Sequence, residues 1–444
     1  MATFIRSIEL PVSAERAFAW HERSGAFTRL TPPWEKVRLL KSVGGIRDGA
    51  EVVVRVNALG PIGFTAVYRH VDYQQGRQFV DIQEKGPFRA WRHEHRFHAS
   101  GSDRCILEDH ITYSAPPLTG AIIEARLDRM FRYRHAITLA DMAYEAAHGP
   151  VQPCRVLLSG ASGLVGRALH ARLTTRGHEV QLLSRRGEGL AWDPARGELA
   201  AHAMQNIDRV IHLAGEPIAQ RWTSKAKRRI MDSRVRSSQL LVDAITQADH
   251  PIGYVAASGI NFYGSSCPQS VNEDSPAGSG FLAEVCKAWE GAAEPLQAAG
   301  SPTTFLRTGV VLSARGGALA KMLPAFRAGL AGPLGTGQQH MSWIALDDLV
   351  DLFLQSIEDP AYQGPLNAVA PQPISNRAFT RSLGRQLKRP TGLPAPAGLL
   401  RMLLGEMADE TLLADLPVEP DRLNALKHLW RLPDLASTLQ LELG

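Results

Sequence analysis

Cysteine and long hydrophobic runs are what this sequence of 444 residues has least of. Its 4 cysteines, Cys105, Cys154, Cys267 and Cys286, are scattered and form no Cys-x-x-Cys pair. This distribution argues against a disulfide framework or a zinc cluster and fits a reducing cytosol. The first residues show no signal-peptide pattern, and no apolar run approaches the length of a membrane span. We therefore expect a cytoplasmic protein with no membrane partner.

A strong excess of charge of one sign is also missing. The 49 lysines and arginines only slightly outnumber the 44 acidic residues, which leaves a formal net charge of +5. The basic stretch 221–236 contains one aromatic residue, so it is more typical of a solvated helix face than of a base-stacking groove. We therefore expect no nucleic-acid partner. The length predicts two or three domains.

The most specific motif is a glycine-rich segment after residue 155. Residues 156–158 predict a short buried strand, glycines follow at 160, 163 and 166, and residues 167–173 favour a helix. The first glycine permits a tight turn, the second lets the backbone approach a pyrophosphate, and the third lets the helix pack against the strand. The segment predicts a dinucleotide site, with a purely structural turn as the alternative. The residues expected to contact the cofactor here are Gly160, Ser162, Gly163, Leu164, Val165 and Gly166.

The end of the next strand indicates which dinucleotide binds. Residues 178–183 predict that strand, and Ser184, Arg185 and Arg186 follow it. An acidic residue there would hold the ribose 2′-hydroxyl of NAD, whereas arginine suits the 2′-phosphate of NADP. We therefore expect NADP, with an ordinary basic turn as the alternative.

From Cys154 onward, strands alternate with helices, which predicts a Rossmann-type doubly wound parallel sheet. Further strands are expected at 210–213, 254–257 and 304–306, with their tips at the carboxyl edge where ligands bind. The remaining cofactor contacts are expected at these tips, from Leu213, Ala214, Gly215, Ala257, Ser258, Arg307, Gly309 and Val310.

The residues before this sheet predict a separate α+β domain over 1–147, joined by a linker at 148–153 that contains one glycine and two prolines. Strands are expected at 4–10, 37–43, 51–59, 63–72, 79–83, 89–98 and 105–114, with short helices at 13–20 and 25–30 and a long helix at 118–147. This order, with the segment from His21 to Trp34, resembles the helix-grip fold of the START and polyketide-cyclase-like superfamily. The resemblance implies a cavity for a small apolar ligand, and a filled core is equally compatible with the pattern.

Three histidines alternate along the strand expected at 89–98. His93 and His95 share one face of such a strand, so a metal pair is geometrically feasible, while His98 faces the other way. We interpret all three as polar positions on a half-exposed strand and expect no metal.

Several segments of the second half resemble a known family. The glycine motif, the segment from His212 to Trp222, the Tyr263-Gly264 turn and the segment from Met341 to Leu349 are similar to extended short-chain dehydrogenase/reductases. More narrowly, they resemble the atypical epimerase family, the SulA-like nucleoside-diphosphate-sugar epimerases. The resemblance implies an NADP-binding domain with substrate-lobe elements over 154–390 and a C-terminal helical domain of unknown function over 391–444.

The catalytic pattern of typical members is not present. Their Tyr-x-x-x-Lys pair falls on Leu282 and Cys286 here, and their helix asparagine falls on Arg234. The remaining catalytic candidates are Ser258, Tyr263 and Cys286. The resemblance places the substrate beside Glu216, Arg221, Trp222, Arg234 and His340.

Two functions remain open at this point. The first is an NADP-dependent oxidoreductase or epimerase acting on a small polar or nucleotide-linked substrate. The second is a non-catalytic protein that senses NADP and binds a small ligand. The missing Tyr-x-x-x-Lys pair keeps the second open, and the oligomeric state cannot be read from these patterns.

Overall fold

The computed structural model describes residues 1–59, 62–114, 119–187 and 189–444. The chain divides into two compact units. The first comprises Met1–Pro153 with Ala171–His178 and Gly444, and the second comprises Cys154–His170 and Glu179–Leu443. All 4 cysteines are free thiols. No helix among the described residues combines the length and hydropathy that crossing a membrane requires.

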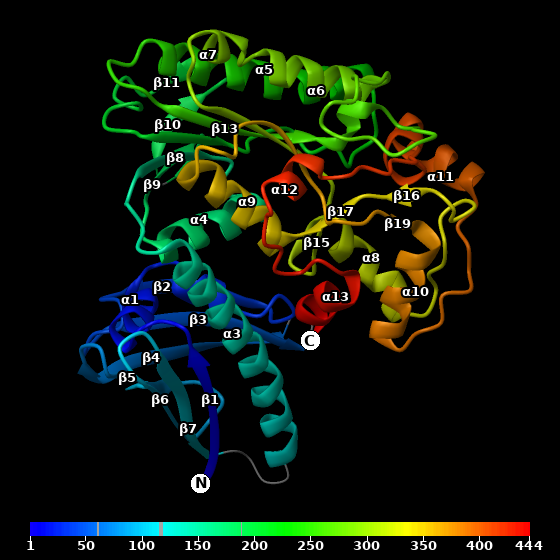
Figure 1. Ribbon diagram of the computed structural model, residues 1–444. Helices are drawn as coiled ribbons and strands as arrows, with labels where there is room; N and C mark the ends of the chain where they lie inside the picture. Colours follow the sequence, from blue (N-terminus) through cyan, green and yellow to red (C-terminus); the bar gives the residue numbers. More distant parts are fainter. Residues whose placement is uncertain (60–61, 115–118, 188) are drawn as a thin grey trace. The chain divides into compact units, whose positions relative to one another are not determined.

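In the described part of the first unit, an antiparallel sheet pairs its strands in the order β1-β7-β6-β5-β4-β3-β2 (Figure 1). The strands are β1 (Ala2–Leu10), β2 (Val37–Val43), β3 (Glu51–Leu59), β4 (Ile62–Gln74), β5 (Gln78–Lys85), β6 (Ala90–Ala99) and β7 (Cys105–Ser114). The helices are α1 (Ala14–Glu22), α2 (Ala26–Leu30) and α3 (Gly120–His148). This arrangement confirms the helix-grip prediction. Leu118, where the long helix was expected to begin, lies outside the described residues.

Local sequence explains these elements. Ser13 caps α1, because its hydroxyl accepts a hydrogen bond from the backbone N–H of Arg16 at 3.4 Å. Every second residue of β7, from Cys105 to Tyr113, is buried, which is the period-two pattern of a strand with one face on a core. A bidentate ion pair between Arg29 of α2 and Asp141 of α3, with N–O distances of 3.1 and 2.7 Å, joins the two helices inside the unit.

The second unit contains a largely parallel sheet in the order β11-β10-β9-β8-β12-β13-β14-β18. Its strands are β8 (Arg155–Ser159), β9 (Glu179–Ser184), β10 (Leu190–Asp193), β11 (Glu198–Leu199), β12 (Arg209–His212), β13 (Gly253–Gly259), β14 (Thr303–Thr308) and β18 (Gly364–Ala368). The predicted parallel strands are confirmed. The strands β10, β11 and β18 were not predicted.

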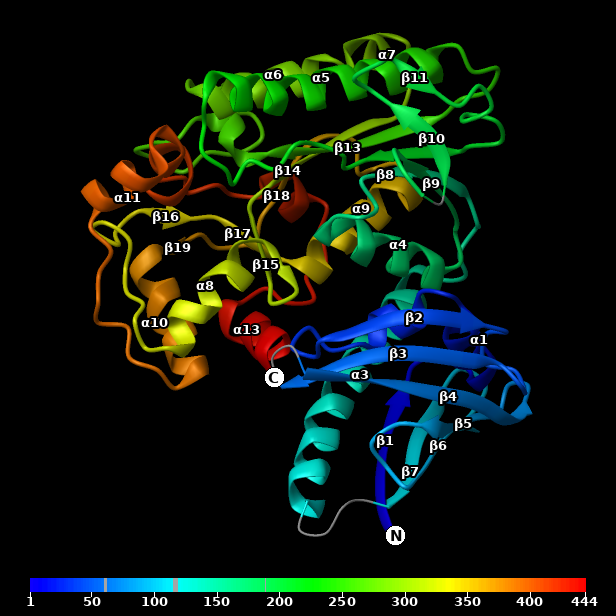
Figure 2. The ribbon, with the colours of Figure 1, turned by 180° about the vertical axis from the view of Figure 1, so that it is seen from behind.

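Helices cover both faces of this sheet (Figures 1 and 2). One face carries α5 (Ser224–Thr246), α6 (Phe281–Gly291) and α7 (Glu294–Ala298), and the other carries α4 (Leu164–Arg176) and α9 (Leu346–Glu358). In the sheet, β8 lies between β9 and β12. The chain first adds strands on the β9 side of β8 and then crosses to the other side, where β12, β13 and β14 follow. That change of side is the topological switch point of a Rossmann fold, and ligands of such sheets bind at its carboxyl edge.

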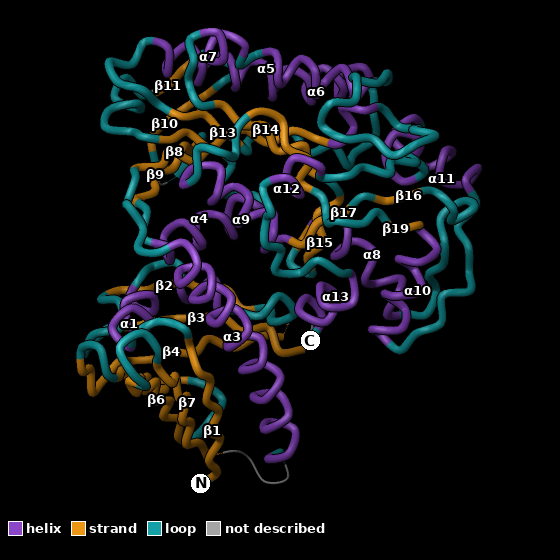
Figure 3. Tube along the Cα trace, viewed as in Figure 1, coloured by secondary structure: helices purple, strands orange, loops and turns teal. Residues whose placement is uncertain are grey.

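The rest of the second unit consists of short elements and long loops (Figure 3). The strands are β15 (Val310–Ser313), β16 (His340–Met341), β17 (Trp343–Ala345) and β19 (Ile374–Ser375), paired as β15-β17 and β16-β19. The helical pieces are η1 (Ile260–Tyr263), α8 (Gly317–Arg327), α10 (Asn376–Leu387), α11 (Ala397–Leu404), η2 (Ala408–Leu412), α12 (Asp421–Ala425) and α13 (Leu435–Leu443).

Candidate cofactor and active site

The glycine-rich loop lies between β8 and α4, at the switch point. Gly160 has a φ of +76°, and a Cβ there would stand 2.8 Å from the backbone N of Ala214 after β12. A Cβ on Gly166 would stand 2.2 Å from the carbonyl oxygen of Gly160. A Cβ on Gly163 would meet only that same oxygen among the described atoms, at 3.3 Å. Gly160 and Gly166 are therefore needed for packing, while Gly163 leaves exposed backbone at the first turn of α4.

The tips of β8 and β12 are fixed to each other through a buried histidine. His212 Nδ1 lies 2.6 Å from Ser159 Oγ, and His212 Nε2 lies 2.8 Å from Ser237 Oγ on α5. Ser237 donates its own proton to the carbonyl of Ser233 at 2.6 Å, so it accepts from the Nε2–H of His212. Burial lowers the pKa of His212 to about 3, and the ring is neutral at physiological pH. Ser159 Oγ also accepts from the N–H of Leu213 at 3.2 Å, so hydrogen bonds link β8, β12 and α5 at the carboxyl edge of the sheet.

The end of β9 presents two cations. The hydroxyl of Ser184 accepts from the N–H of Arg186 at 3.2 Å and so shapes the turn. Arg185 and Arg186 are both exposed. The three residues lie at the carboxyl end of a strand that pairs in parallel with β8, which is where the adenosine ribose binds in Rossmann folds.

Ser258 and Tyr263 are tied into one buried network. Ser258 at the end of β13 donates to Glu290 of α6 at 2.7 Å. Arg307 of β14 pairs with both carboxylate oxygens of Glu290, at 2.9 and 2.8 Å, and donates to the Tyr263 hydroxyl at 2.9 Å. Tyr263 in turn donates to Asn367 of β18 at 2.8 Å. Five secondary-structure elements of the second unit, β13, η1, α6, β14 and β18, thus meet around one ion pair.

This network has consequences for the predicted roles. Burial raises the pKa of Tyr263, although the Arg307 guanidinium and the hydrogen bonds act in the opposite direction. The phenol therefore holds its proton well above neutral pH. The guanidinium of Arg307, predicted to contact the cofactor, is engaged by Glu290 and also stacks on Phe262, with 3.4 Å between Cζ and the ring centroid.

Cys286 and Arg234 lie deep in the unit, on α6 and α5. Burial raises the pKa of the Cys286 thiol to about 11, with Ser258 and the Gly259 backbone as hydrogen-bonding neighbours that lower it. Arg234 is only 7% exposed, and its guanidinium donates to the carbonyl of Glu216 at 3.0 Å. Ser258 and Cys286 are therefore brought together, whereas the guanidinium of Arg234 supports the backbone after β12.

The other predicted substrate residues lie beyond β12. Glu216 accepts from Arg229 at 3.3 Å, and Arg221 is exposed. Trp222 packs edge-on against Phe281 at the start of α6, with 5.0 Å between the ring centroids. These side chains form a mixed polar and aromatic surface beside the N-terminus of α6.

His340 lies on β16, in the lobe that the elements after β14 form. Its ring Nδ1 lies 2.9 Å from a carboxylate oxygen of Asp415, which also accepts from the His340 backbone N–H at 2.7 Å. The same lobe contains a cavity of about 290 Å³ that none of the predicted site residues lines. Its lining residues are Pro333, Gly335, Thr336, Arg377, Thr380, Arg381, Thr391, Gly392 and Pro394.

Three residues of the site were missed as functional positions. Glu290, Asn367 and Glu410 belong to no motif that the sequence shows. Both carboxylate oxygens of Glu410 accept from the first N–H groups of α6, those of Phe281 at 2.8 Å and Leu282 at 2.7 Å. Because these partners are 129 and 128 residues apart in the chain, no local spacing could have revealed them.

The histidines of β6 differ from the expectation. His93 and His95 are 3% and 7% exposed, so they are buried rather than on a half-exposed strand, while His98 is exposed as predicted. The inner face of β6 is covered by other parts of the unit, and Phe131 of α3 packs edge-on against His93 with 5.4 Å between ring centroids. Polar residues in an alternating series mark a solvent face only when nothing covers it.

Three family models match the chain. The model of the NAD dependent epimerase/dehydratase family matches residues 156–368, and the model of polyketide cyclase / dehydrase and lipid transport matches 10–134. A domain of unknown function, DUF1731, matches 395–441.

Relatives match the second unit, and one solved structure matches nearly the whole chain. An epimerase family protein of Mycobacterium bovis is 41% identical over 263 residues, which cover 58% of this chain and 87% of that protein. The nucleoside-diphosphate sugar epimerase of Corynebacterium glutamicum has 31% identity and a TM-score of 0.83, covering 99% of this chain and 90% of that chain. The structure of human epimerase family protein SDR39U1 with NADPH has 34% identity and a TM-score of 0.60, covering 65% and 98%.

The fold is therefore a Rossmann-type α/β fold joined to a helix-grip domain. The chain belongs to the epimerase family, as the resemblance in the sequence implied.

Proposed function

We propose that this protein binds NADP(H) at the carboxyl edge of β8 and β9 and acts as an oxidoreductase or epimerase on a small polar or nucleotide-linked substrate. The observation that carries the proposal is the combination of the open Gly163 position with two exposed arginines at the end of β9. The relative solved with NADPH supports the choice of cofactor.

The residues of the switch point fit the phosphates of this cofactor. The backbone near Gly163 lies at the first turn of α4, where N–H groups and the helix dipole favour an anion. Ser162 and Gly163 are exposed, so a pyrophosphate would reach this backbone without displacing a packed side chain. Arg185 and Arg186 would hold the 2′-phosphate through charge-assisted hydrogen bonds.

At the other end of the crevice, the nicotinamide would supply or accept the hydride. The chain's own task there is to orient the substrate and handle a proton. Ser258 has its hydroxyl proton directed at Glu290, which leaves its oxygen lone pairs for a donor group of the substrate. Glu290, Arg307 and Tyr263 would hold Ser258 in this orientation as positioning residues.

The cofactor assignment is tested by titrating full-length protein with NADPH and with NADH. Arg185→Ala and Arg186→Ala should each weaken NADPH binding by about 10- to 100-fold, because each removes a charged hydrogen bond to the 2′-phosphate. NADH affinity should change by less than about twofold, since NADH lacks that phosphate.

Arg155→Ala is the matched control. Arg155 is an exposed arginine at the amino end of β8, paired with Glu179 at 3.0 Å, and its loss should leave both affinities unchanged. Equal affinity of the wild type for the two cofactors would overturn the NADP preference. Absence of saturable binding would overturn the whole proposal.

A non-catalytic NADP- and ligand-binding protein is the second candidate. It is favoured by Leu282 and Cys286 at the positions of the usual Tyr and Lys, and by a buried Cys286 thiol whose pKa is raised to about 11. Turnover of NADPH with a panel of carbonyl compounds and sugar nucleotides, lost in Ser258→Ala, supports the enzyme. Tight binding with no turnover on the panel supports the second candidate.

A further inference from the structure

Five ionisable side chains gather inside the first unit, far in sequence from the nucleotide site. Asp81 lies on β5, His93 and His95 on β6, Asp109 on β7 and His135 on α3. The three histidines and Asp109 are less than one-tenth exposed, and the side chain of Asp81 is 16% exposed. Nothing in the function proposed above uses this cluster.

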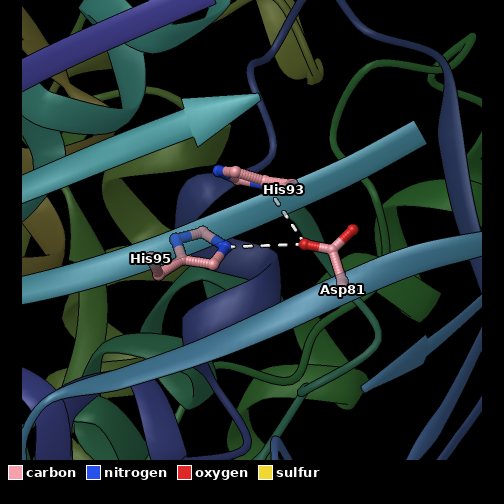
Figure 4. A group of neighbouring side chains, drawn as sticks. All are labelled: Asp81, His93 and His95. Carbon is pink, nitrogen blue, oxygen red and sulfur yellow. Dashed lines mark ion pairs between the residues drawn. The ribbon is translucent and has the colours of Figure 1, made fainter. Parts of the chain in front are cut away.

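Three of these residues present ligand atoms to one point. His93 Nδ1 lies 3.1 Å and His95 Nε2 lies 3.6 Å from the same oxygen, Oδ2 of Asp81. Figure 4 shows both rings directed at this carboxylate, and all three ligand atoms lie within 4.8 Å of one another. Tetrahedral Zn²⁺ with bonds of about 2.0–2.1 Å separates its ligand atoms by about 3.3–3.4 Å. The two observed separations lie on either side of that value.

Asp109 contacts the opposite side of the same rings. Its Oδ1 lies 2.9 Å from His93 Nε2, and its Oδ2 lies 2.7 Å from His135 Nε2. His95 Nδ1 is 2.7 Å from Oδ1, at ion-pair distance but outside hydrogen-bond geometry. Metal-bound histidines commonly direct their second ring nitrogen at a carboxylate, which fixes the ring and its tautomer. Asp109 occupies that position for His93 and lies at ion-pair distance from the second ring nitrogen of His95.

The register of the sheet produces this arrangement. Asp81 is the cross-strand partner of His93 in the β5–β6 pair, and His95 is the partner of Asp109 in the β6–β7 pair. Directly opposed residues lie on the same face, and every second residue of a strand returns to it. His70 of β4 is the partner of Asp81, is 7% exposed, and has a buried Nδ1 without a hydrogen-bond partner.

The protein itself offsets part of the negative charge in this cluster. Two carboxylates in a protein interior are costly unless they are neutralised. Arg134 acts electrostatically on both, but its Nε donates to the carbonyl of Leu30 at 3.3 Å. His93 lies at ion-pair distance from both carboxylates, 3.1 Å from Asp81 and 2.9 Å from Asp109. Although burial acts to lower it, the pKa of His93 is raised to about 9 by these carboxylates, so a metal ion at its Nδ1 would take the place of a proton.

We propose that the first unit binds a divalent transition-metal ion of the Zn²⁺ class, through His93 Nδ1, His95 Nε2 and the carboxylate of Asp81. Asp109 positions the two histidines from behind. A set of two histidines and one carboxylate leaves a further position, as in metal sites that bind water or a substrate there. His70 lies on the strand beside Asp81 and is the nearest unpartnered imidazole in the register to fill that position.

The test uses full-length, untagged protein stripped of metal with a chelator. After incubation with Zn²⁺ and gel filtration, elemental analysis should find close to one zinc per chain. Zn²⁺ should also raise the thermal midpoint, because an ion that binds only the folded state stabilises it. His95→Gln and Asp81→Asn should lose both effects. Asp109→Asn should keep the site but weaken affinity by about 10- to 100-fold, as expected for a residue behind the ligands.

His98→Gln is the matched control, because His98 lies exposed on the same strand and the opposite face. It should bind zinc like the wild type. A circular dichroism spectrum of each variant shows whether it is folded. If His95→Gln or Asp81→Asn unfolds, the weaker zinc affinity expected of Asp109→Asn still tests the site. Failure of the wild type to take up zinc would overturn the proposal. So would equal uptake by His95→Gln and His98→Gln, or a thiolate charge-transfer band with Co²⁺, which would place the metal on cysteine.

Discussion

At the scale of the residue, the three glycines of the nucleotide loop have different physical reasons to be glycine. Gly160 adopts a positive φ and lies against the backbone after β12, and Gly166 lies against Gly160. Both are required by packing within the protein. Gly163 is exposed, and a Cβ there would meet only the carbonyl oxygen of Gly160, at 3.3 Å. Its identity is therefore explained chiefly by the approach of a ligand that needs bare backbone.

Two substitutions separate these reasons. Gly166→Ala should destabilise the protein by about 1–3 kcal/mol, because its Cβ would overlap backbone atoms that cannot move easily. Gly163→Ala should change stability by less than about 0.5 kcal/mol and still weaken NADPH binding. Urea unfolding and NADPH titration of both variants check this. A large loss of stability in Gly163→Ala, or none in Gly166→Ala, would contradict the assigned roles.

At the scale of the element, helix α6 depends on the C-terminal part of the chain. It carries Cys286 and Glu290, and its first N–H groups are capped by Glu410 from η2 rather than by a residue preceding the helix. A carboxylate at a helix N-terminus satisfies unpaired N–H groups and complements the helix dipole. The segment matched by the domain of unknown function therefore supports the helix beside the predicted active site.

Glu410→Ala should cost about 1–3 kcal/mol of stability, because it leaves two buried N–H groups without acceptors. Glu410→Gln should fall between this variant and the wild type. Asp409→Ala is the control, since Asp409 is an exposed neighbour in an ion pair with Arg401 at 2.8 Å, and it should cost less than about 1 kcal/mol. Urea unfolding and amide exchange of α6 measure the effect. Equal losses from Glu410→Ala and Asp409→Ala would show that the cap is unimportant.

At the scale of the whole molecule, the last helix, α13, packs into the second unit and carries a buried carboxyl group, that of Glu442. Glu442 of α13 accepts from the N–H of Ala314 at 2.7 Å and from the hydroxyl of Ser313 at 3.1 Å. Burial raises its pKa from the usual 4.5 of a glutamate to about 7. The folded state therefore holds this proton more tightly than the unfolded state does. The resulting stabilisation is complete below pH about 4.5 and is lost as the pH rises through about 7.

Glu442→Gln removes this dependence. The variant should match the wild type in its free energy of unfolding near pH 4.5 and exceed it at pH 8, on the order of 2–3 kcal/mol. Urea unfolding at several pH values measures the difference. Asp274→Asn, which removes an exposed carboxyl paired with Arg422 at 3.1 Å, should show no such growth with pH. A constant difference between Glu442→Gln and the wild type would refute this account.

Much of the architecture could be predicted because it depends on local patterns of alternating residues, turns and glycines. The strands β2, β3 and β7 have the predicted bounds, since alternation and flanking turns define a strand over a few residues. The glycine loop between β8 and α4 was equally clear, because strand, glycines and helix follow one another directly. The same local reasoning misjudged His93 and His95, because an alternating polar strand does not reveal whether its face is covered.

The sequence by itself thus determined two fold types, their order along the chain and the position of the nucleotide loop. These depend on backbone preferences and on the periodicity of neighbouring residues. Only the tertiary structure decided that Glu290 joins Ser258 to Arg307, that Glu410 caps α6, and that Asp81 faces the histidines of β6. Strand register and helix packing bring such distant residues together. Register and packing depend on burial across a whole unit, and they produce no repeating pattern in the sequence that would reveal the contacts.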